Sequence, residues 1–279
     1  MSLEQGSSDF LNRPSVAMLS SKGPSQTGVL IVNADDWGRD HETTQRIFEC
    51  IQHGTVSSVS AMVFMEDSER SAAMAREHGI DAGLHLNLTT PFSARSCPIK
   101  LRECQDEVAG YLRRRSSSRV VYHPWLARSF EYAVKAQIEE YGRIYGTEPE
   151  RFDGHHHMHL SANVLLRDLL PIGTLVRRHF SYEPDEKYLR NGLFRQFTNF
   201  LLARRYRIVD FLFSLPPLEP PARLQRIFSL ARQSVVELET HPVKPEEYRF
   251  LTGAEILRWA GDCTIAHSFA VPRRGHTAK

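Results

Sequence analysis

The sequence lacks the features of a secreted disulfide-rich protein, a membrane protein and a nucleic-acid-binding protein. Only four of the 279 residues are cysteine, and no two of them form a C-x-x-C pair. No apolar run approaches the roughly 20 residues that a transmembrane helix requires. The net charge is +2, from 35 basic and 33 acidic residues, so nothing attracts the whole chain to nucleic acid or an anionic membrane. We therefore expect a cytoplasmic protein with reduced thiols, without a membrane span and without a nucleic-acid partner.

The composition predicts one large folded domain that follows an irregular arm. A hydrophobic content of 41% excludes a disordered chain, and a chain of this length can form an undivided α/β barrel. Residues 1–27 are rich in Ser, Gly and Pro, and their one apolar patch is too short for a secretory signal. We predict a flexible N-terminal arm over residues 1–27 and a single domain over residues 28–279.

Strand-like and helix-like segments alternate along the chain. Strands are predicted over residues 28–33, 56–63, 82–88, 206–212 and 234–241, with a further short strand before His155. Helices are predicted over residues 42–53, 66–78, 129–145, 161–170, 192–205 and 246–260. Residues 91–124, with the basic run 113–119, are interpreted as a solvated loop or excursion. A nucleic-acid contact is the alternative, but no interleaved aromatic residues or matching basic face accompany the run. The alternation is typical of βα units, so the sequence predicts an α/β fold with a parallel sheet.

Polar residues stand where several of these strands end. Asp35 and Asp36 directly follow the first strand, His85 lies on the third, and His155 and His241 end later ones. The carboxyl ends of parallel strands lie at one edge of a sheet, so we expect these residues to converge on one cleft. Two adjacent buried carboxylates repel each other and must be desolvated, and a divalent cation would offset both costs.

Four of the thirteen histidines fall within the seven-residue run Asp153–His159. Histidine is the commonest side-chain metal ligand, although an isolated cluster could equally be an exposed surface patch. One ion cannot use four imidazoles, so His156, His157 and His159 are interpreted as supporting or helix-capping groups. One carboxylate, two imidazoles and positions left for water are typical of a catalytic Zn²⁺ or a related divalent ion. The second carboxylate of the Asp pair would then be free to act as a base.

Four blocks of sequence together resemble the YdjC-like carbohydrate deacetylases, a family that includes the chitooligosaccharide deacetylases and a relative in hopanoid biosynthesis. The blocks are residues 33–38, 83–89, 153–159 and 237–242, in the family's order. The resemblance implies an irregular (β/α) barrel of the polysaccharide-deacetylase-like type. It also implies a metal-dependent hydrolase of linear amide bonds, which removes an N-acetyl group from an amino sugar, an oligosaccharide or a glycoconjugate.

The resemblance also implies roles for individual residues. Asp36, His85 and His155 match the family's metal ligands, and Asp35 matches its base. The implied ion is Mg²⁺, with Zn²⁺ or another divalent ion left open. His241, which ends the late strand, is the best-placed acid for the leaving amine. Its structural alternative is a strand-end histidine that satisfies a loop carbonyl.

Three departures from the family pattern leave the identity of the sugar substrate undetermined. Trp37 stands where the family often has Phe, Val243 stands where a Gly often follows, and residues 160–163 lack an expected proline. Trp37 either walls the cleft or stacks on a sugar. None of these changes affects the residues that match metal ligands.

Two other classes of function are compatible with the pattern. A metal-dependent phosphoesterase could use the same ligand types, but the sequence has no Gly-rich phosphate-binding loop and too few carboxylates for a second metal. A non-catalytic sugar- or metal-binding relative could keep the scaffold, but it would have little reason to hold Asp35 beside a metal ligand. The native metal and the oligomeric state stay open, and a homodimer is one option.

Overall fold

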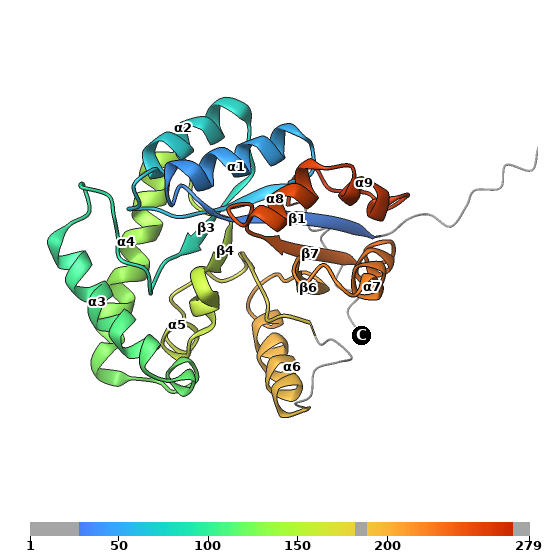
Figure 1. The fold of residues 1–279 in the computed structure, drawn as a ribbon. Helices are drawn as coiled ribbons and strands as arrows, with labels where there is room; N and C mark the ends of the chain where they lie inside the picture. Colours follow the sequence, from blue (N-terminus) through green and yellow to red (C-terminus); the bar gives the residue numbers. More distant parts are fainter. Residues whose placement is uncertain (1–27, 182–188, 270–279) are drawn as a thin grey trace, which may run out of the picture.

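Short apolar segments rich in β-branched residues form the strands of one parallel sheet. The structure is a computed structural model that describes residues 28–181 and 189–269 (Figure 1). The predicted arm over residues 1–27 lies outside the described residues. The strands, in chain order, are β1 Val29–Trp37, β2 Ser58–Ala61, β3 Ala82–Leu86, β4 Arg151–Gly154, β5 Leu175–Val176, β6 Phe211–Ser214 and β7 Val235–Thr240. Their order in the sheet is β5-β4-β3-β2-β1-β7-β6, and every described pairing is parallel.

The sheet curls, and backbone bonds outside the strands link its two edge strands. Leu175 of β5 forms an isolated parallel bridge with Arg207, which precedes β6. The backbone N–H of Ser181, after β5, donates to the carbonyl of Leu212 in β6 at 2.8 Å. The predicted irregular (β/α) barrel is therefore confirmed, with an irregular closure between β5 and β6.

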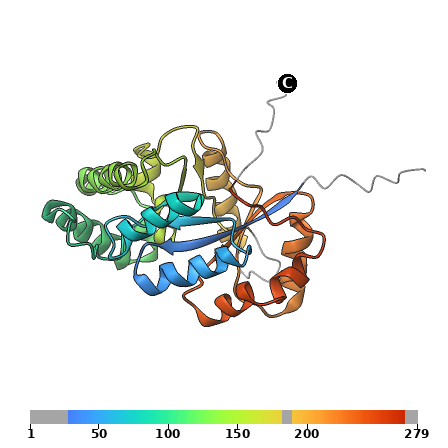
Figure 2. The same cartoon turned by 90° about the horizontal axis from the view of Figure 1, so that it is seen from above.

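Helices cover the outer face of the sheet, as Figures 1 and 2 show. They are α1 His41–Gln52, α2 Ser68–His78, α3 Ile99–Arg114, α4 Ala127–Tyr145, α5 Ala162–Leu166, α6 Leu189–Ala203, α7 Pro221–Ala231, α8 Pro245–Thr252 and α9 Glu255–Ala260. No helix among the described residues is long and apolar enough to span a membrane.

The two faces of each strand serve different purposes. In β1, Leu30, Val32 and Ala34 belong to the main hydrophobic core. The alternate residues Asn33 and Asp35 hydrogen-bond to each other, to Ser60 of β2 and to Arg177, which follows β5. Since successive side chains of a strand point to opposite faces, the outer layer of the barrel is apolar and part of its interior is polar.

Three sequence predictions of secondary structure were wrong. Residues 91–124 are not a loop, because α3 occupies their centre and buries Leu101, Val108 and Leu112 at helical spacing. The many charged residues of that segment masked its narrow apolar stripe. The predicted last helix is two helices that part at Gly253, and the predicted strand over 206–212 begins only at Phe211. Helix α7 and strand β5 were not predicted.

Gly38 fixes the turn that follows the Asp pair, and we expect it to tolerate no side chain. Its φ is +88°, and a Cβ would lie 2.6 Å from Ser71 Oγ and 3.1 Å from the carbonyl of Met62. Gly38→Ala should lower the free energy of unfolding by at least about 2 kcal/mol, from the left-handed backbone and from overpacking. Urea unfolding measures the change.

Gly54→Ala is the matched control, because Gly54 also has a positive φ of +71° but nothing lies within 4 Å of its Cβ position. This variant should lower the free energy of unfolding by only about 1 kcal/mol, because only the left-handed backbone conformation contributes. Equal losses in the two variants would show that the space around Gly38 is not restrictive.

Candidate metal centre and active site

The end of β1 directs two adjacent aspartates into the same site. Successive residues of a regular strand point to opposite faces, so a regular β1 would turn Asp36 away from Asp35. Instead, Asp36 has a φ of +70°, and the pairing with β2 shifts register between Ala34 and Trp37. This irregularity turns both carboxylates to the carboxyl end of the barrel. A non-glycine residue in this conformation is strained, as is common at functional sites.

Asp36, His85 and His155 form a buried group whose ligand atoms lie within 4.8 Å of one another. His155 Nδ1 lies 2.9 Å and His85 Nε2 lies 3.4 Å from Asp36 Oδ1. Despite these short distances, neither Asp36 Oδ1 nor His85 Nε2 has a hydrogen-bond partner among the described residues. Buried polar atoms are rarely left unpaired. Three buried ligand atoms that face a common point fit a shared cation.

Asp153 determines which nitrogen of His85 faces this group. His85 Nδ1 lies 2.7 Å from Asp153 Oδ1, and the other carboxylate oxygen accepts a 2.5 Å hydrogen bond from Ser60. A carboxylate that accepts the Nδ1–H leaves Nε2 to face Asp36, and many metal-binding histidines are oriented in this way. Burial alone would lower the pKa of His85, but Asp35 and Asp153 raise it to about 10. Without a metal, His85 is therefore an imidazolium.

The neighbouring histidines lower the pKa of Asp36. Burial would raise the pKa of its carboxyl, but His155 and His85 hold it well below its usual range. Its second oxygen, Oδ2, accepts a hydrogen bond from Arg39 at 2.7 Å. Asp36 is thus an anion with one oxygen tied to a cation and the other turned to two imidazoles.

Arg177, which the sequence analysis missed, lies fully buried among carboxylates inside the barrel. Its two terminal nitrogens bind the two oxygens of Asp35 at 2.6 and 2.7 Å. It also lies 2.7 Å from Glu237, 3.2 Å from Asp153 and 3.3 Å from Glu239. Asp35 can also be grouped with His85 and Asp153, or with Glu239 and His241. Because the guanidinium already occupies both Asp35 oxygens, the Asp36 group is the better cation site.

The four histidines of the run 155–159 point in four directions. His156 and His157 both have positive φ, 56° and 58°, so the backbone turns sharply at each. His156 Nδ1 lies 3.0 Å from Thr89 Oγ1, His157 Nε2 lies 3.2 Å from Glu239, and His159 Nε2 lies 2.9 Å from the carbonyl of Arg177. Of the four, only His155 belongs to a cation-holding group of the described residues.

Burial determines the charge of two of these rings. Burial, and then the charge of His157, lowers the pKa of His159 to about 3. Burial, and then the charge of His155, lowers the pKa of His156 to about 4. Both rings are therefore neutral at pH 7 and act as hydrogen-bonding groups.

His241 follows β7 and lies on the Asp35 side of the site. One of its ring nitrogens lies within 4.8 Å of ligand atoms of Asp35 and Glu239, and its Nδ1 has no partner among the described residues. Its backbone N–H donates to Glu247 at 2.7 Å, which fixes the end of the strand. The half-buried ring therefore lies next to the Asp35 and Glu239 carboxylates.

Trp37 neither walls the cleft nor reaches a sugar, because it is fully buried in the hydrophobic core.

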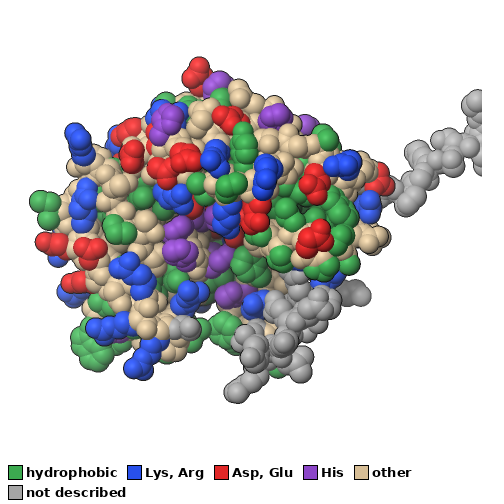
Figure 3. All heavy atoms as spheres, viewed as in Figure 1, with side chains coloured by type: hydrophobic (Ala, Val, Ile, Leu, Met, Phe, Trp, Pro, Cys, Tyr) green, Lys and Arg blue, Asp and Glu red, His purple; other side chains and the backbone are tan. Residues whose placement is uncertain are grey.

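Figure 3 shows histidine side chains gathered in a hollow in the middle of one face, with Lys and Arg around it.

The sequence indicates part of the carboxylate network around Arg177. Glu237 and Glu239 alternate with apolar residues in β7, and two carboxylates on one face of a buried strand require a buried cation. Arg177 itself follows β5, a strand of only two residues, and no local pattern predicts it.

The parallel barrel thus carries its acidic and histidine side chains at the carboxyl ends of the strands, where the active sites of (β/α) barrels lie. The model of the YdjC-like protein family matches residues 29–262. The chain therefore belongs to the YdjC-like family, as its four sequence blocks predicted.

Curated relatives of the chain are named chitooligosaccharide deacetylases. The protein of Serratia marcescens is 32% identical over 141 residues, which are 49% of this chain and 52% of the relative. The protein of Enterobacter sp. (strain 638) is 32% identical over 133 residues, 47% of this chain and 50% of the relative. The matches thus span about half the length of these curated relatives.

A solved structure supports the fold. A protein of Enterococcus faecalis that is named for the cleavage of cellobiose phosphate superposes with a TM-score of 0.60, at 18% identity. The superposition covers 86% of this chain and 97% of that protein. At this identity the likeness shows a shared fold only.

We expect Arg177 to be essential for stability. Arg177→Met would leave Asp35, Asp153 and Glu237 buried without their counter-ion, so the protein should lose about 3–5 kcal/mol of unfolding free energy. Chemical denaturation at pH 7 measures this loss. Arg167→Met, which removes an exposed ion pair with Glu131, is the control and should change stability far less. Similar losses in both variants would contradict the central role of Arg177.

Proposed function

We propose that the protein is a metal-dependent carbohydrate deacetylase, which hydrolyses the N-acetyl group of an amino sugar, oligosaccharide or glycoconjugate. One observation carries the proposal: the Asp36, His85 and His155 group lies beside a second carboxylate, Asp35, and a free imidazole, His241. Amide hydrolysis needs a Lewis acid, a base for water and an acid for the amine, and this set offers all three. The names of the curated relatives support the same reaction.

Asp36, His85 and His155 would hold the ion. A bound divalent cation would polarise the acetamido carbonyl and lower the pKa of a water molecule. The family resemblance implies Mg²⁺, but Mg²⁺ prefers oxygen ligands whereas imidazole suits Zn²⁺ and its neighbours. With two imidazoles against one carboxylate, the donor set favours a transition-metal ion.

Asp35 and His241 would divide the proton transfers between them. Arg177 and Asn33 hold the Asp35 carboxylate in one orientation, so that it can accept the proton of the attacking water. His241 would donate a proton to the amine nitrogen as the C–N bond breaks. Neutral His156, beside His155, would shape the site without adding charge to it.

A cytoplasmic location and a homodimer stay predictions from the sequence. Fractionation of the native host and sedimentation of the purified chain would test them.

Two substitutions should separate the aspartates. Asp36→Ala removes the oxygen between the imidazoles, so the protein should lose its metal and its activity together. Asp35→Asn should keep the metal and lower acetate release from N-acetylated chitooligosaccharides by about 10²–10⁴-fold, the usual contribution of a general base. Metal analysis and an acetate assay with and without chelator provide the two readings. Full turnover in Asp35→Asn would refute its role as base.

His241→Ala should affect amides more than esters. Expulsion of an amine needs a proton, so turnover of the amide should fall by about 10²–10⁴-fold. An activated acetyl ester, whose leaving group needs no proton, should be hydrolysed nearly as fast as by the parent protein. Metal content should not change, and His53→Ala, at an exposed histidine after α1, controls for histidine loss in general. Equal losses on both substrates would assign His241 a structural role.

A further inference from the structure

Helix α6 turns five large apolar side chains to solvent, whereas two of its polar side chains are buried. Thr198 and Asn199 lie on the buried side, where the Asn199 side chain accepts a hydrogen bond from the backbone N–H of His179 at 2.9 Å. A helix on the surface of a globular protein normally has the opposite arrangement, with its apolar stripe toward the core. An exposed apolar stripe indicates a partner. Its members are between 44% and 66% exposed: Leu193, Phe194, Phe197, Phe200 and Leu201.

The exposed stripe borders an apolar groove of about 500 Å³ between α5 and α6. Figure 1 shows both helices on the side of the barrel away from α1 and α2. Two hydrogen bonds between His123 and Asn163 hold the segment after the 3₁₀ helix Ser116–Arg119 against α5. The groove and the stripe together form what we call the α5–α6 face. The apolar side chains of the groove come from three separate segments: Val120, Leu165, Leu166, Phe194, Phe197 and Leu201.

The charge of the α5–α6 face has one sign. Residues 108–130 and 189–209, which supply two of its three segments, each contain five arginines and no acidic residue. Three arginines line the groove, and no carboxylate among the described residues does. Arg205 pairs with Asp168, whereas Arg204 lies over the ring of Phe200, 5.7 Å from its centroid. The small net charge of the whole chain thus conceals a concentration of positive charge beside the apolar stripe.

The charge and the apolar stripe together favour one kind of partner. A second copy that packed symmetrically on this face would bring the arginines of both copies together, and like charges oppose such a contact. Duplex nucleic acid would neutralise the arginines but would not remove the exposed Leu and Phe side chains from water. An anionic lipid bilayer does both, because apolar side chains enter the boundary of the acyl chains while guanidinium groups meet the lipid phosphates.

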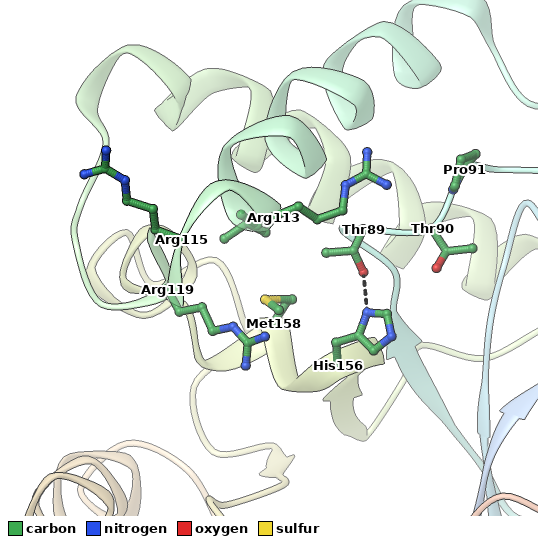
Figure 4. A pocket seen from close by; sticks show the side chains of 9 residues that line it. Thr89, Thr90, Pro91, Arg113, Arg115, Arg119, His156 and Met158 are labelled. Atoms are coloured by element: carbon green, nitrogen blue, oxygen red, sulfur yellow. Dashed lines mark hydrogen bonds between the residues drawn. The ribbon is translucent and has the colours of Figure 1, made fainter. Parts of the chain in front are cut away.

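We propose that the α5–α6 face docks on an anionic lipid bilayer, with α6 in the plane of the interface. Exposed Phe and Leu side chains beside arginines are typical of helices that bind in this way. The indole of Trp125, 85% exposed on the segment held against α5, is of a type that gathers at the level of the headgroups. Arg119 also lines the pocket in Figure 4, together with His156, so the docked face lies near the candidate active site. The inference does not depend on the proposed reaction.

Co-sedimentation of the full chain with lipid vesicles tests the apolar part of the contact. The probes are vesicles of phosphatidylcholine alone and of an equimolar mixture with phosphatidylglycerol. The chain should bind the mixed vesicles at least about 10-fold more tightly than the neutral ones, and added salt should weaken that binding. Phe197→Ser/Phe200→Ser should lower the affinity for mixed vesicles by at least about 10-fold, because two rings no longer leave water. Ile99→Ser/Leu257→Ser, at two exposed apolar residues of α3 and α9, should bind as the parent does.

A second pair of variants tests the charge. Arg119→Gln/Arg204→Gln should lower the affinity for mixed vesicles by about 10- to 30-fold, about 5-fold for each arginine. It should also reduce the dependence of binding on salt. Arg249→Gln/Arg258→Gln, at exposed arginines of α8 and α9, removes the same charge elsewhere and should change the affinity far less.

The outcomes separate the bilayer from other partners. A thermal unfolding scan shows which variants are folded, and the arginine variants test the face even where the loss of two Phe side chains affects folding. No binding of the parent chain to mixed vesicles, or equal binding by the parent and both variants of the face, would overturn the proposal. A dimer in lipid-free sedimentation that Phe197→Ser/Phe200→Ser dissociates, without vesicle binding, would overturn it in favour of a second copy. Binding to duplex DNA in place of vesicles would also overturn it.

Discussion

The structure depends on one buried guanidinium, that of Arg177, which lies inside the barrel among carboxylates from three strands. Asp35 of β1, Asp153 of β4 and two glutamates of β7 all lie within 3.3 Å of it. Buried charges of this kind are tolerated only if each one is paired and hydrogen-bonded. Burial, only partly offset by Arg177, raises the pKa of Glu237 to about 7. The interior of the barrel is therefore organised by charge, and its apolar core lies outside the sheet, under the helices.

Polar contacts of their own side chains stabilise the strained residues at the ends of the strands. Asp36, His156 and His157 all have positive φ, a conformation that costs about 1–3 kcal/mol per residue. Each is held by contacts that the strain makes possible: Asp36 by Arg39, His156 by Thr89 and His157 by Glu239. Relaxation of any one would break its polar contact, so the irregular backbone persists. The site is thus preorganised by contacts on several strands.

The sequence predicted most of what depends on local pattern. The alternation of apolar segments indicated a parallel sheet, and the family resemblance implied the barrel. Polar residues at strand ends indicated one cleft for Asp35, Asp36, His85, His155 and His241, and the resemblance singled out Asp36, His85 and His155. It could not predict Arg177, because a two-residue strand has no periodicity and its partners are distant in sequence. The interpretation of residues 91–124 as a loop was wrong because the charged side chains of α3 outnumber its buried apolar ones. Turns that depend on backbone strain, such as the one at Asp36, have no signature in a single sequence.

Adjacent aspartates have different tasks because their neighbours differ. Both oxygens of Asp35 are taken by Arg177, and one also accepts a hydrogen bond from Asn33. Asp36 accepts a hydrogen bond from Arg39 through one oxygen, and its other oxygen faces His155 and His85 at 2.9 and 3.4 Å.

Asp36 keeps one oxygen that no guanidinium contacts, whereas both oxygens of Asp35 accept hydrogen bonds from Arg177, so Asp36 is the better placed of the two to serve as a metal ligand. Conversely, a carboxylate fixed from two sides cannot turn toward an ion but can hold one orientation toward a water molecule. The different environments thus give different roles to two chemically identical side chains one residue apart. Arg177 brings this about, since without it Asp35 would compete with Asp36 for the same ion.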